Sequence, residues 1–148
     1  MLRTKLSIFL FVLFTLFTAC KDDNPVAPAP APTPTTGTVS GTVTLPAGAS
    51  GTVANARVSI YASYEDWRAD RVLKVAAAAS NGAFTISDVA PGSYYLDVWK
   101  DIDNTVSISS GDVYGVYGSG SYPNYTVSPF SVSAGNTTSI NVQLNIIP

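Results

Sequence analysis

The sequence predicts an all-β domain over residues 38–148, an antiparallel β-sandwich of seven or eight strands. Two observations lead to this prediction. From Thr38 onward, apolar and polar residues alternate in runs of strand length, a pattern typical of strands buried on one face. Turn-forming pairs such as Asn81-Gly82 and Pro91-Gly92 separate these runs.

The composition alone excludes several classes of function. Only 12% of the 148 residues are charged, the formal net charge is −2, and no Lys/Arg cluster follows the first five residues. We therefore expect no nucleic-acid partner. The chain has no histidine and one cysteine, Cys20, which excludes histidine-based acid/base catalysis, Cys/His zinc sites and an intrachain disulfide. A small sandwich also offers no deep catalytic cleft, so we predict that the protein is not an enzyme.

The N-terminus has the pattern of an export signal. Arg3 and Lys5 precede the apolar run from Leu6 to Phe17, which ends in Thr18-Ala19-Cys20. A basic start, a short apolar run and small residues at its end predict a signal peptide over residues 1–19. The alternative is a transmembrane helix, but the run is shorter than the ~20 residues that a bilayer core requires.

The segment 17–20, Phe-Thr-Ala-Cys, resembles the end of a bacterial lipoprotein signal, where a small residue precedes a cysteine that is lipid-modified. This resemblance implies that Cys20 carries acyl chains and anchors the mature protein in the bacterial outer membrane. The following Lys21-Asp22-Asp23-Asn24 resembles the Lys/acidic tract that marks lipoproteins for surface display in Bacteroidetes-like bacteria. The alternative for this tract is a solvated polar start.

A linker of Pro, Ala and Thr completes the N-terminal region, which spans residues 20–37. The segment 25–37, PVAPAPAPTPTTG, has nothing to bury and favours extended polyproline II at about 3.1 Å per residue. We expect it to act as a semi-rigid spacer before the domain.

The strands of the first half follow from the alternation. The first strand begins at Thr38 and buries Val39 and Val43. The second buries one set of residues and exposes the other: Ala56, Val58, Ile60 and Ala62 face inward, and Arg57, Ser59, Tyr61 and Ser63 face outward. Residues 64–74 form a helical turn or a long loop, in which Trp67 either covers the core edge, the reading we favour, or stands exposed as a contact.

The central hairpin is predicted from Asn81-Gly82, the strongest short-range hairpin signal, which would pair a strand at 72–79 with the strand of Phe84 and Ile86. A second turn follows at 88–92, with Gly92 in the left-handed conformation. The next strand, 93–100, places Tyr94, Leu96 and Val98 on one face and Tyr95, Asp97 and Trp99 on the other. The second face is too aromatic for an ordinary solvent-exposed surface.

Four segments together resemble a known family. They are Gly-Thr-Val-Ser-Gly-Thr-Val at 37–43, Ala-Arg-Val at 56–58, Asn-Gly-Ala-Phe at 81–84 and Val-Ala-Pro-Gly-Ser-Tyr at 89–94. Their order is similar to that in carboxypeptidase regulatory-like domains, which are transthyretin-like or starch-binding-like β-sandwiches. The resemblance covers about residues 37–100. It implies the fold more than a function, since some relatives bind carbohydrate and others are spacers or stalks.

An acidic loop follows this strand. Asp101, Asp103 and Asp112 occupy the first, third and twelfth places of a loop, which is the spacing of oxygen ligands in a twelve-residue calcium loop. We predict a calcium site formed by these three aspartates with Asn104 as an additional ligand. The alternative is a solvated turn.

Tyrosines among glycines make up the next segment. Tyr114, Tyr117, Tyr122 and Tyr125 either join Tyr95 and Trp99 in a stacking platform for sugar rings or fold back over the end of the sandwich, the reading we favour. The ligand-binding candidates are Tyr95, Trp99, Tyr114 and Tyr117. The chain closes with a predicted hairpin, in which a turn at 134–136 joins the strand of Phe130 and Val132 to the strand of Ile140 and Val142.

Three functional classes differ in what they require of this sequence. An enzyme would need a carboxylate pair from Asp97, Asp101, Asp103 and Asp112 in a cleft that a small sandwich lacks. The prediction is a membrane-tethered binding or accessory module whose partner is a glycan or a surface protein. The alternative is a purely structural or protein-interaction module with no small ligand.

Overall fold

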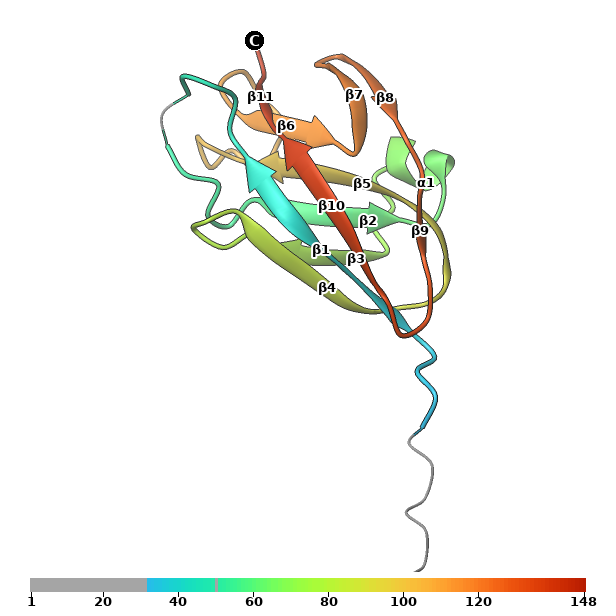
Figure 1. Cartoon of the computed structure of the whole chain (residues 1–148). Helices are drawn as coiled ribbons and strands as arrows, with labels where there is room; N and C mark the ends of the chain where they lie inside the picture. The colour runs from blue at the N-terminus through green and yellow to red at the C-terminus, as the bar shows by residue number, and fades with distance from the viewer. Residues whose placement is uncertain (1–31, 50) are drawn as a thin grey trace, which may run out of the picture. The chain divides into compact units, whose positions relative to one another are not determined.

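The computed structural model describes residues 32–49 and 51–148, and Figure 1 shows strands packed in two layers. Cys20, the predicted signal peptide and the tract at 21–24 lie outside the described residues. Residues 32–36 have no regular secondary structure, and the first strand begins at Gly37. In the described part of the chain, no helix has the length and apolarity needed to cross a bilayer.

The smaller layer has three strands in the order β10 (Thr137–Gln143), β1 (Gly37–Thr44) and β4 (Ala83–Val89). These strands lie at the front in Figure 1. β1 pairs antiparallel with β4 and parallel with β10. The alternation predicted for these strands is observed, with Val39, Ile86 and Ile140 turned into the core.

The larger layer runs in the order β11 (Asn145–Ile146), β6 (Val113–Val116), β5 (Gly92–Lys100), β2 (Arg57–Tyr61) and β3 (Lys74–Ala77). β9 (Phe130–Val132) pairs with the start of β5. α1 (Tyr64–Arg68) follows β2, so the helical turn was the correct alternative for this segment. β7 (Gly118–Ser121) and β8 (Asn124–Val127) form a separate hairpin at the upper end of the view in Figure 1.

The core lies between the two layers. Val58, Ile60, Leu96 and Val98 of the larger sheet are fully buried against side chains of the smaller sheet. Each buried aliphatic side chain of this size contributes about 1.5–3 kcal/mol relative to an exposed one. Because the chain has no disulfide to add, this burial is the main stabilising term of the domain.

The structure confirms the predicted all-β sandwich, and it differs in strand count and in one pairing. It has eleven strands in the described residues, where seven or eight were predicted. The additional strands β6, β7, β8 and β11 contain two to four residues each and show little apolar alternation. The β1–β10 pair is parallel, whereas all pairs were expected to be antiparallel.

The hairpin predicted at Asn81-Gly82 is wrong, although the turn is present. β3 pairs with β2 in the larger sheet, and β4 pairs with β1 in the smaller one. The turn therefore connects the two layers. Gly82 has φ +83°, and its carbonyl accepts a hydrogen bond of 2.9 Å from the Val43 amide, which holds the connection against β1.

Two further turns also connect the two layers. At the connection predicted over 88–92, the positive φ is at Asp88, 56°, near the end of β4, and not at Gly92, which begins β5. The turn at 134–136 forms as predicted, with Gly135 at φ 72°. It joins β9 of one layer to β10 of the other, so the final pair of strands is not a hairpin.

The outer face of β2 is the last difference. Ser59 and Tyr61, predicted to face solvent, are each 1% exposed, whereas Ala62 lies beyond the end of the strand and is exposed. Both faces of the larger sheet are therefore covered by other residues. The candidate site lies among the residues that cover its outer face, the face turned away from the smaller sheet.

Candidate functional site

A second apolar cluster covers the outer face of the larger sheet. Tyr114 and Val116 of β6, Val127 of β8 and Ile147 form its buried part, and four aromatic residues pack against it: Trp67, Tyr95, Trp99 and Tyr125. Tyr95, Asp97 and Trp99 are successive outward residues of β5, because side chains of a strand alternate between its faces. The aromatic face predicted for β5 thus lies under a partial cover.

Asp97 lies at the centre of this face and is only 7% exposed. The Tyr114 hydroxyl donates to its Oδ2 at 2.7 Å, and the Tyr61 hydroxyl lies 3.0 Å from the same atom. Tyr61 Oη is also 3.0 Å from Asp70 Oδ1. A hydroxyl has one proton to donate, so Tyr61 cannot donate to both carboxylates at once.

Burial raises the pKa of Asp97 from 3.8 to about 6, because desolvation disfavours the charged carboxylate. The hydrogen bonds from Tyr114 and Tyr61 oppose this rise. Burial, together with the nearby Asp97 carboxylate, also raises the pKa of the Tyr61 and Tyr114 hydroxyls. Both tyrosines therefore remain hydrogen-bond donors at neutral pH.

A pocket of about 620 Å³ opens above this network, and we call it the indole pocket. Its aromatic lining is Trp67, Trp99, Tyr61 and Tyr114; its charged lining is Arg57, Arg68, Asp70 and Asp97; its remaining wall is Val106, Ser107 and Ile108 of the acidic loop. Volumes of about 300–1,000 Å³ are typical of small-molecule sites. Residues from α1, β2, β5, β6 and one long loop thus converge on one concave surface.

Internal hydrogen bonds fix both indoles. Trp67 Nε1 donates to Tyr114 Oη at 3.2 Å, and Trp99 Nε1 donates to Asp112 Oδ2 at 3.1 Å. α1, which positions Trp67, is capped by the Ser63 side chain, whose Oγ accepts from the Asp66 amide at 3.0 Å. With their N–H groups bonded inside the protein, the indoles present apolar ring surface to the pocket.

Polar groups of opposite charge flank this ring surface. An Arg57 guanidinium nitrogen lies 3.6 Å from Asp70 Oδ1, and the two side chains are 38% and 69% exposed. A guanidinium only donates hydrogen bonds and a carboxylate only accepts them. The rim can therefore bond both the oxygen and the hydrogen of a ligand hydroxyl.

The acidic loop brings its three aspartates together. One carboxylate oxygen from each of Asp101, Asp103 and Asp112 lies within 4.8 Å of the others. Asp112 is fully buried, and its oxygens accept from the Ile102 amide at 2.8 Å and the Ser109 amide at 3.1 Å. Calcium binds oxygens at about 2.3–2.6 Å, so oxygens on opposite sides of one ion are about 5 Å apart, and these carboxylates fit around it.

Asn104 is held in the loop through its backbone. Its backbone N–H donates to Asp101 Oδ1, and its φ is 59°. The Val106 amide donates to Asp101 Oδ2 at 2.8 Å. Amide donors of the loop thus already contact the carboxylates, which also fits the solvated-turn alternative.

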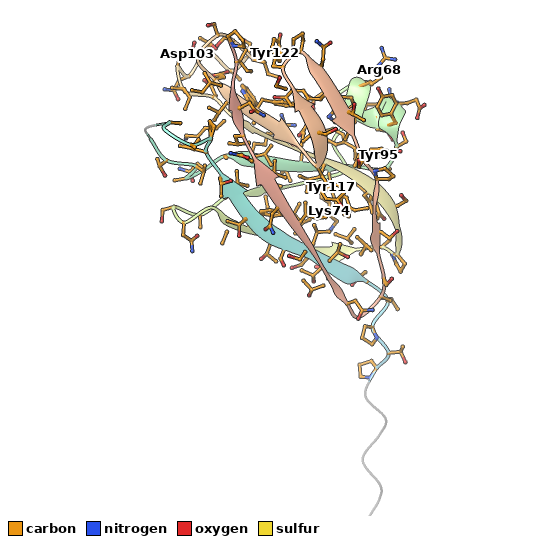
Figure 2. All side chains as sticks on the ribbon, turned by 45° about the horizontal axis from the view of Figure 1, so that its top comes forward. Arg68, Lys74, Tyr95, Asp103, Tyr117 and Tyr122 are labelled. Carbon is orange, nitrogen blue, oxygen red and sulfur yellow. The ribbon has the colours of Figure 1, made fainter. Side chains whose placement is uncertain are left out.

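The predicted ligand-binding residues do not form one platform. Trp99 and Tyr114 line the indole pocket, although the Tyr114 side chain is largely buried. Tyr95 packs edge-on against Tyr64, with ring centroids 6.0 Å apart, and Figure 2 shows it on the side of the domain that carries Arg68 and α1. Tyr117 packs against Phe130, with ring centroids 5.8 Å apart, and lines a different cleft.

The sequence did not predict Tyr61, Arg57 and Asp70 as pocket residues, and a contact role for Trp67 was only the alternative. A signal for Tyr61 was present, since the alternation of β2 put it on the outer face of the sheet, as it put Trp99 on that of β5. The register pairs Tyr61 with Tyr95 and Arg57 with Trp99. That register is set by tertiary pairing and cannot be read from either strand alone.

No protein-family model matches the chain, and no curated protein matches it. The resemblance to carboxypeptidase regulatory-like domains therefore stays a prediction.

Three solved structures are similar in fold. One is a minor pilin of Streptococcus agalactiae, with 14% identity over 78% of this chain and 47% of that chain, and a TM-score of 0.45. The second is the TIE protein of Bacillus anthracis, with 12% identity over 76% of this chain and 17% of that chain, and a TM-score of 0.44. The third is a candidate carbohydrate-binding protein of Pseudomonas aeruginosa, with 14% identity over 76% of this chain and 90% of that chain, and a TM-score of 0.44.

This chain thus spans about half the length of the pilin and less of the TIE protein. The likeness lies in the course of the backbone, and a shared fold by itself assigns no function.

Proposed function

We propose that the protein is a non-enzymatic carbohydrate-binding module, tethered to the bacterial outer membrane by lipid on Cys20 and displayed at the cell surface. The observation that supports this function best is the indole pocket, where the rings of Trp67 and Trp99 adjoin the Arg57–Asp70 pair. Apolar C–H faces of a sugar ring pack on indole rings, and ring hydroxyls bond to flanking charged groups.

A binding role fits the pocket better than catalysis. Asp97 is the one buried carboxylate in its lining, and the Tyr114 hydroxyl donates to it while the Tyr61 hydroxyl lies 3.0 and 3.2 Å from its two oxygens. Such a group is held in place by its neighbours and presents little surface for attack on a substrate. Asp70, in contrast, is exposed and suited to accept hydrogen bonds from a ligand.

The test uses the full-length chain, labelled with ¹⁵N and purified in a detergent without a sugar headgroup. The chain has two tryptophans, so the two indole N–H signals report on the pocket. We expect at least one of maltohexaose, cellohexaose and N-acetylchitohexaose to shift both signals. No shift with any saccharide would contradict the function.

Matched variants locate the contact. Asp70→Asn keeps the shape of a pocket side chain and removes its charge, so we expect the Kd to rise about tenfold or more, because a hydrogen bond to a charged group contributes about 1.5–3 kcal/mol. Glu65→Gln removes an exposed carboxylate of α1 that does not line the pocket. We expect that control to bind like the wild type.

The alternative, a protein-interaction module, has its own supporting observation. β3 is an edge strand of the larger sheet, and the apolar side chains of Leu73 and Val75 beside and within it are 49% and 58% exposed. Exposed apolar edges favour pairing with another chain. A wild-type protein that binds no saccharide would support this alternative.

A further inference from the structure

A second concave surface lies outside the indole pocket, between the β7–β8 hairpin and the outer face of β10 and β11. This cleft has a volume of about 440 Å³, and we call it the amide cleft. Tyr125 lines it, and Tyr114 lines the indole pocket. The two rings pack with centroids 5.2 Å apart, and Tyr125 Oη donates to the Tyr114 carbonyl at 3.1 Å. One tyrosine pair therefore separates two distinct cavities.

Three side-chain amides form one wall of the cleft. Asn141, Gln143 and Asn145 occupy alternate positions along β10 and into β11, so they project from the same face. Asn141 Oδ1 accepts from the Thr42 amide at 3.1 Å. This bond fixes the orientation of the Asn141 amide and leaves its NH₂ group as the donor for a ligand.

The opposite wall consists of tyrosine rings and hydroxyl groups. Tyr117 is held by Phe130, and Tyr125 by Tyr114, so packing fixes both rings before any ligand arrives. Ser119 and Ser128 add hydroxyls. Rigid tyrosines beside small polar residues bind at low cost in conformational entropy, as they do in antibody paratopes.

Charge distinguishes the two cavities. The described residues that line the amide cleft include no charged side chain, whereas Arg57, Arg68, Asp70 and Asp97 line the indole pocket. An ionic ligand would enter the cleft without a counter-charge. Amides and hydroxyls both donate and accept hydrogen bonds, as the adjacent hydroxyls of a sugar do.

We propose that the amide cleft is a second binding site, specific for a neutral oligosaccharide and independent of the indole pocket. This second site goes beyond the proposed function, because that function requires only the indole pocket.

The experiment uses the ¹⁵N-labelled full-length chain and follows the side-chain NH₂ signals of Asn141, Gln143 and Asn145 together with the two indole signals. The probes are cellohexaose, maltohexaose and N-acetylchitohexaose, with hexagalacturonate as an acidic comparison and an uncharged hexapeptide as an extended-peptide comparison. We expect at least one neutral hexasaccharide to shift the cleft signals, and hexagalacturonate and the peptide to leave them unchanged.

Variants that introduce a negative or a positive charge test whether the saccharide contacts the cleft. Gln143→Glu and Gln143→Lys each place a charge at an exposed position in the cleft lining. We expect both to raise the Kd of the neutral saccharide about tenfold, since the bound saccharide would cover a charge that has no partner. Ser139→Glu places the same charge on the same face of β10 outside the cleft lining. We expect this control, and Asp70→Asn in the indole pocket, to leave the affinity at the cleft unchanged.

The outcomes separate the two proposals. Saccharide shifts at the indoles alone would support the proposed function and overturn the second site. Shifts at the cleft amides alone would support the second site and contradict the indole pocket as the glycan site. Preference for the acidic saccharide or the peptide, wild-type affinity in either Gln143 variant, or no cleft shift up to about 10 mM saccharide would each overturn the inference.

Discussion

Two carboxylates, Asp97 and Asp70, face the single hydroxyl proton of Tyr61. When both are charged, one of them lacks this donor. Protonation of Asp97 resolves the conflict, because its new O–H can donate to Tyr61 Oη while Tyr61 donates to Asp70. The geometry thus agrees with a raised pKa for Asp97.

The raised pKa predicts how stability depends on pH. The folded pKa of Asp97 is about 6 and the ordinary value is 3.8, so the folded state binds more protons between these values than the unfolded state. The contribution of Asp97 to the free energy of unfolding is therefore full below about pH 4 and declines as the pH rises to about 6. With 1.36 kcal/mol for each pKa unit, the decline amounts to about 3 kcal/mol.

Asp97→Asn should remove this decline, because the amide has the shape and hydrogen-bonding pattern of the protonated acid. Denaturant unfolding at pH 4 and pH 7.5 measures it: the variant should gain stability relative to the wild type as the pH rises. Other carboxyls are common to both proteins and cancel in the difference. Parallel stability curves for the two proteins would contradict the prediction.

A second residue-scale prediction concerns Gly82. Gly82 and Gly48 share a φ of +83°, but a Cβ at Gly82 would lie 2.1 Å from the Val43 carbonyl oxygen, whereas nothing lies within 4 Å of one at Gly48. Both Gly→Ala changes incur a backbone cost of about 1 kcal/mol or more. Gly82→Ala should destabilise by at least about 2 kcal/mol more than Gly48→Ala, since β1 and the turn must separate. Equal losses in urea unfolding would show that the turn is not held against β1.

At the scale of elements, strands were predictable where one face is buried. Val39 and Val43, or Tyr94, Leu96 and Val98, alternate in a way that only a strand satisfies. The layer to which each strand belongs was not predictable, because Asn81-Gly82 permits a tight turn whether the next strand pairs with its predecessor or crosses to the other sheet. The short strands β6 and β7 were not predicted, because their sequences, VYGV and GSGS, contain no alternation of apolar and polar residues.

The candidate site, like the fold, was predictable only in part. Trp99 and the aspartates of the acidic loop were found from local spacing. Tyr61, Arg57 and Asp70 were not found, because they reach the pocket through the pairing of β2 with β5 and through α1. Convergence across strands depends on register, which local patterns leave open.

The acidic loop gives the element-scale prediction. We propose that Asp101, Asp103 and Asp112 bind calcium, since their oxygens lie close enough to share an ion. Free calcium at about 100 times its Kd should stabilise the fold by about 2.7 kcal/mol and raise Tm by roughly 10 °C. Calorimetry in calcium and in chelator measures this shift.

Asp103→Asn should abolish the calcium-dependent rise in Tm, because the exposed Asp103 would lose a charged ligand while keeping an oxygen for the Thr105 amide. Asp88→Asn, at an exposed position near the end of β4 with φ 56°, is the matched control and should retain the rise. Identical Tm values in calcium and chelator for the wild type would support the solvated turn instead.

For the whole molecule, the proposed lipid on Cys20 determines where both cavities can act. The spacer predicted at 25–37 lies in the sequence between that cysteine and the body of the domain, and polyproline II would span about 3.1 Å for each of its residues. A module held in this way meets ligands near the membrane, whichever cavity binds them. The proposed function at the cell surface would therefore depend on one side chain far from either cavity in sequence.

Cys20→Ser tests the anchor directly. Acyl chains contribute about 0.8 kcal/mol for each buried methylene, so two or more chains hold a protein on a bilayer and their loss releases it. Expressed in a Gram-negative host with an alkyne-labelled fatty acid, the wild type should carry the label, sediment with membranes and enter the detergent phase. Cys20→Ser should carry no label and lose at least about nine-tenths of its membrane-bound fraction.

The control is Asn24→Ala, a substitution in the adjacent tract at 21–24, which should behave like the wild type. Membrane sedimentation of Cys20→Ser at the wild-type level would mean that the apolar segment before Cys20 is retained as the anchor, and the lipoprotein assignment would fall.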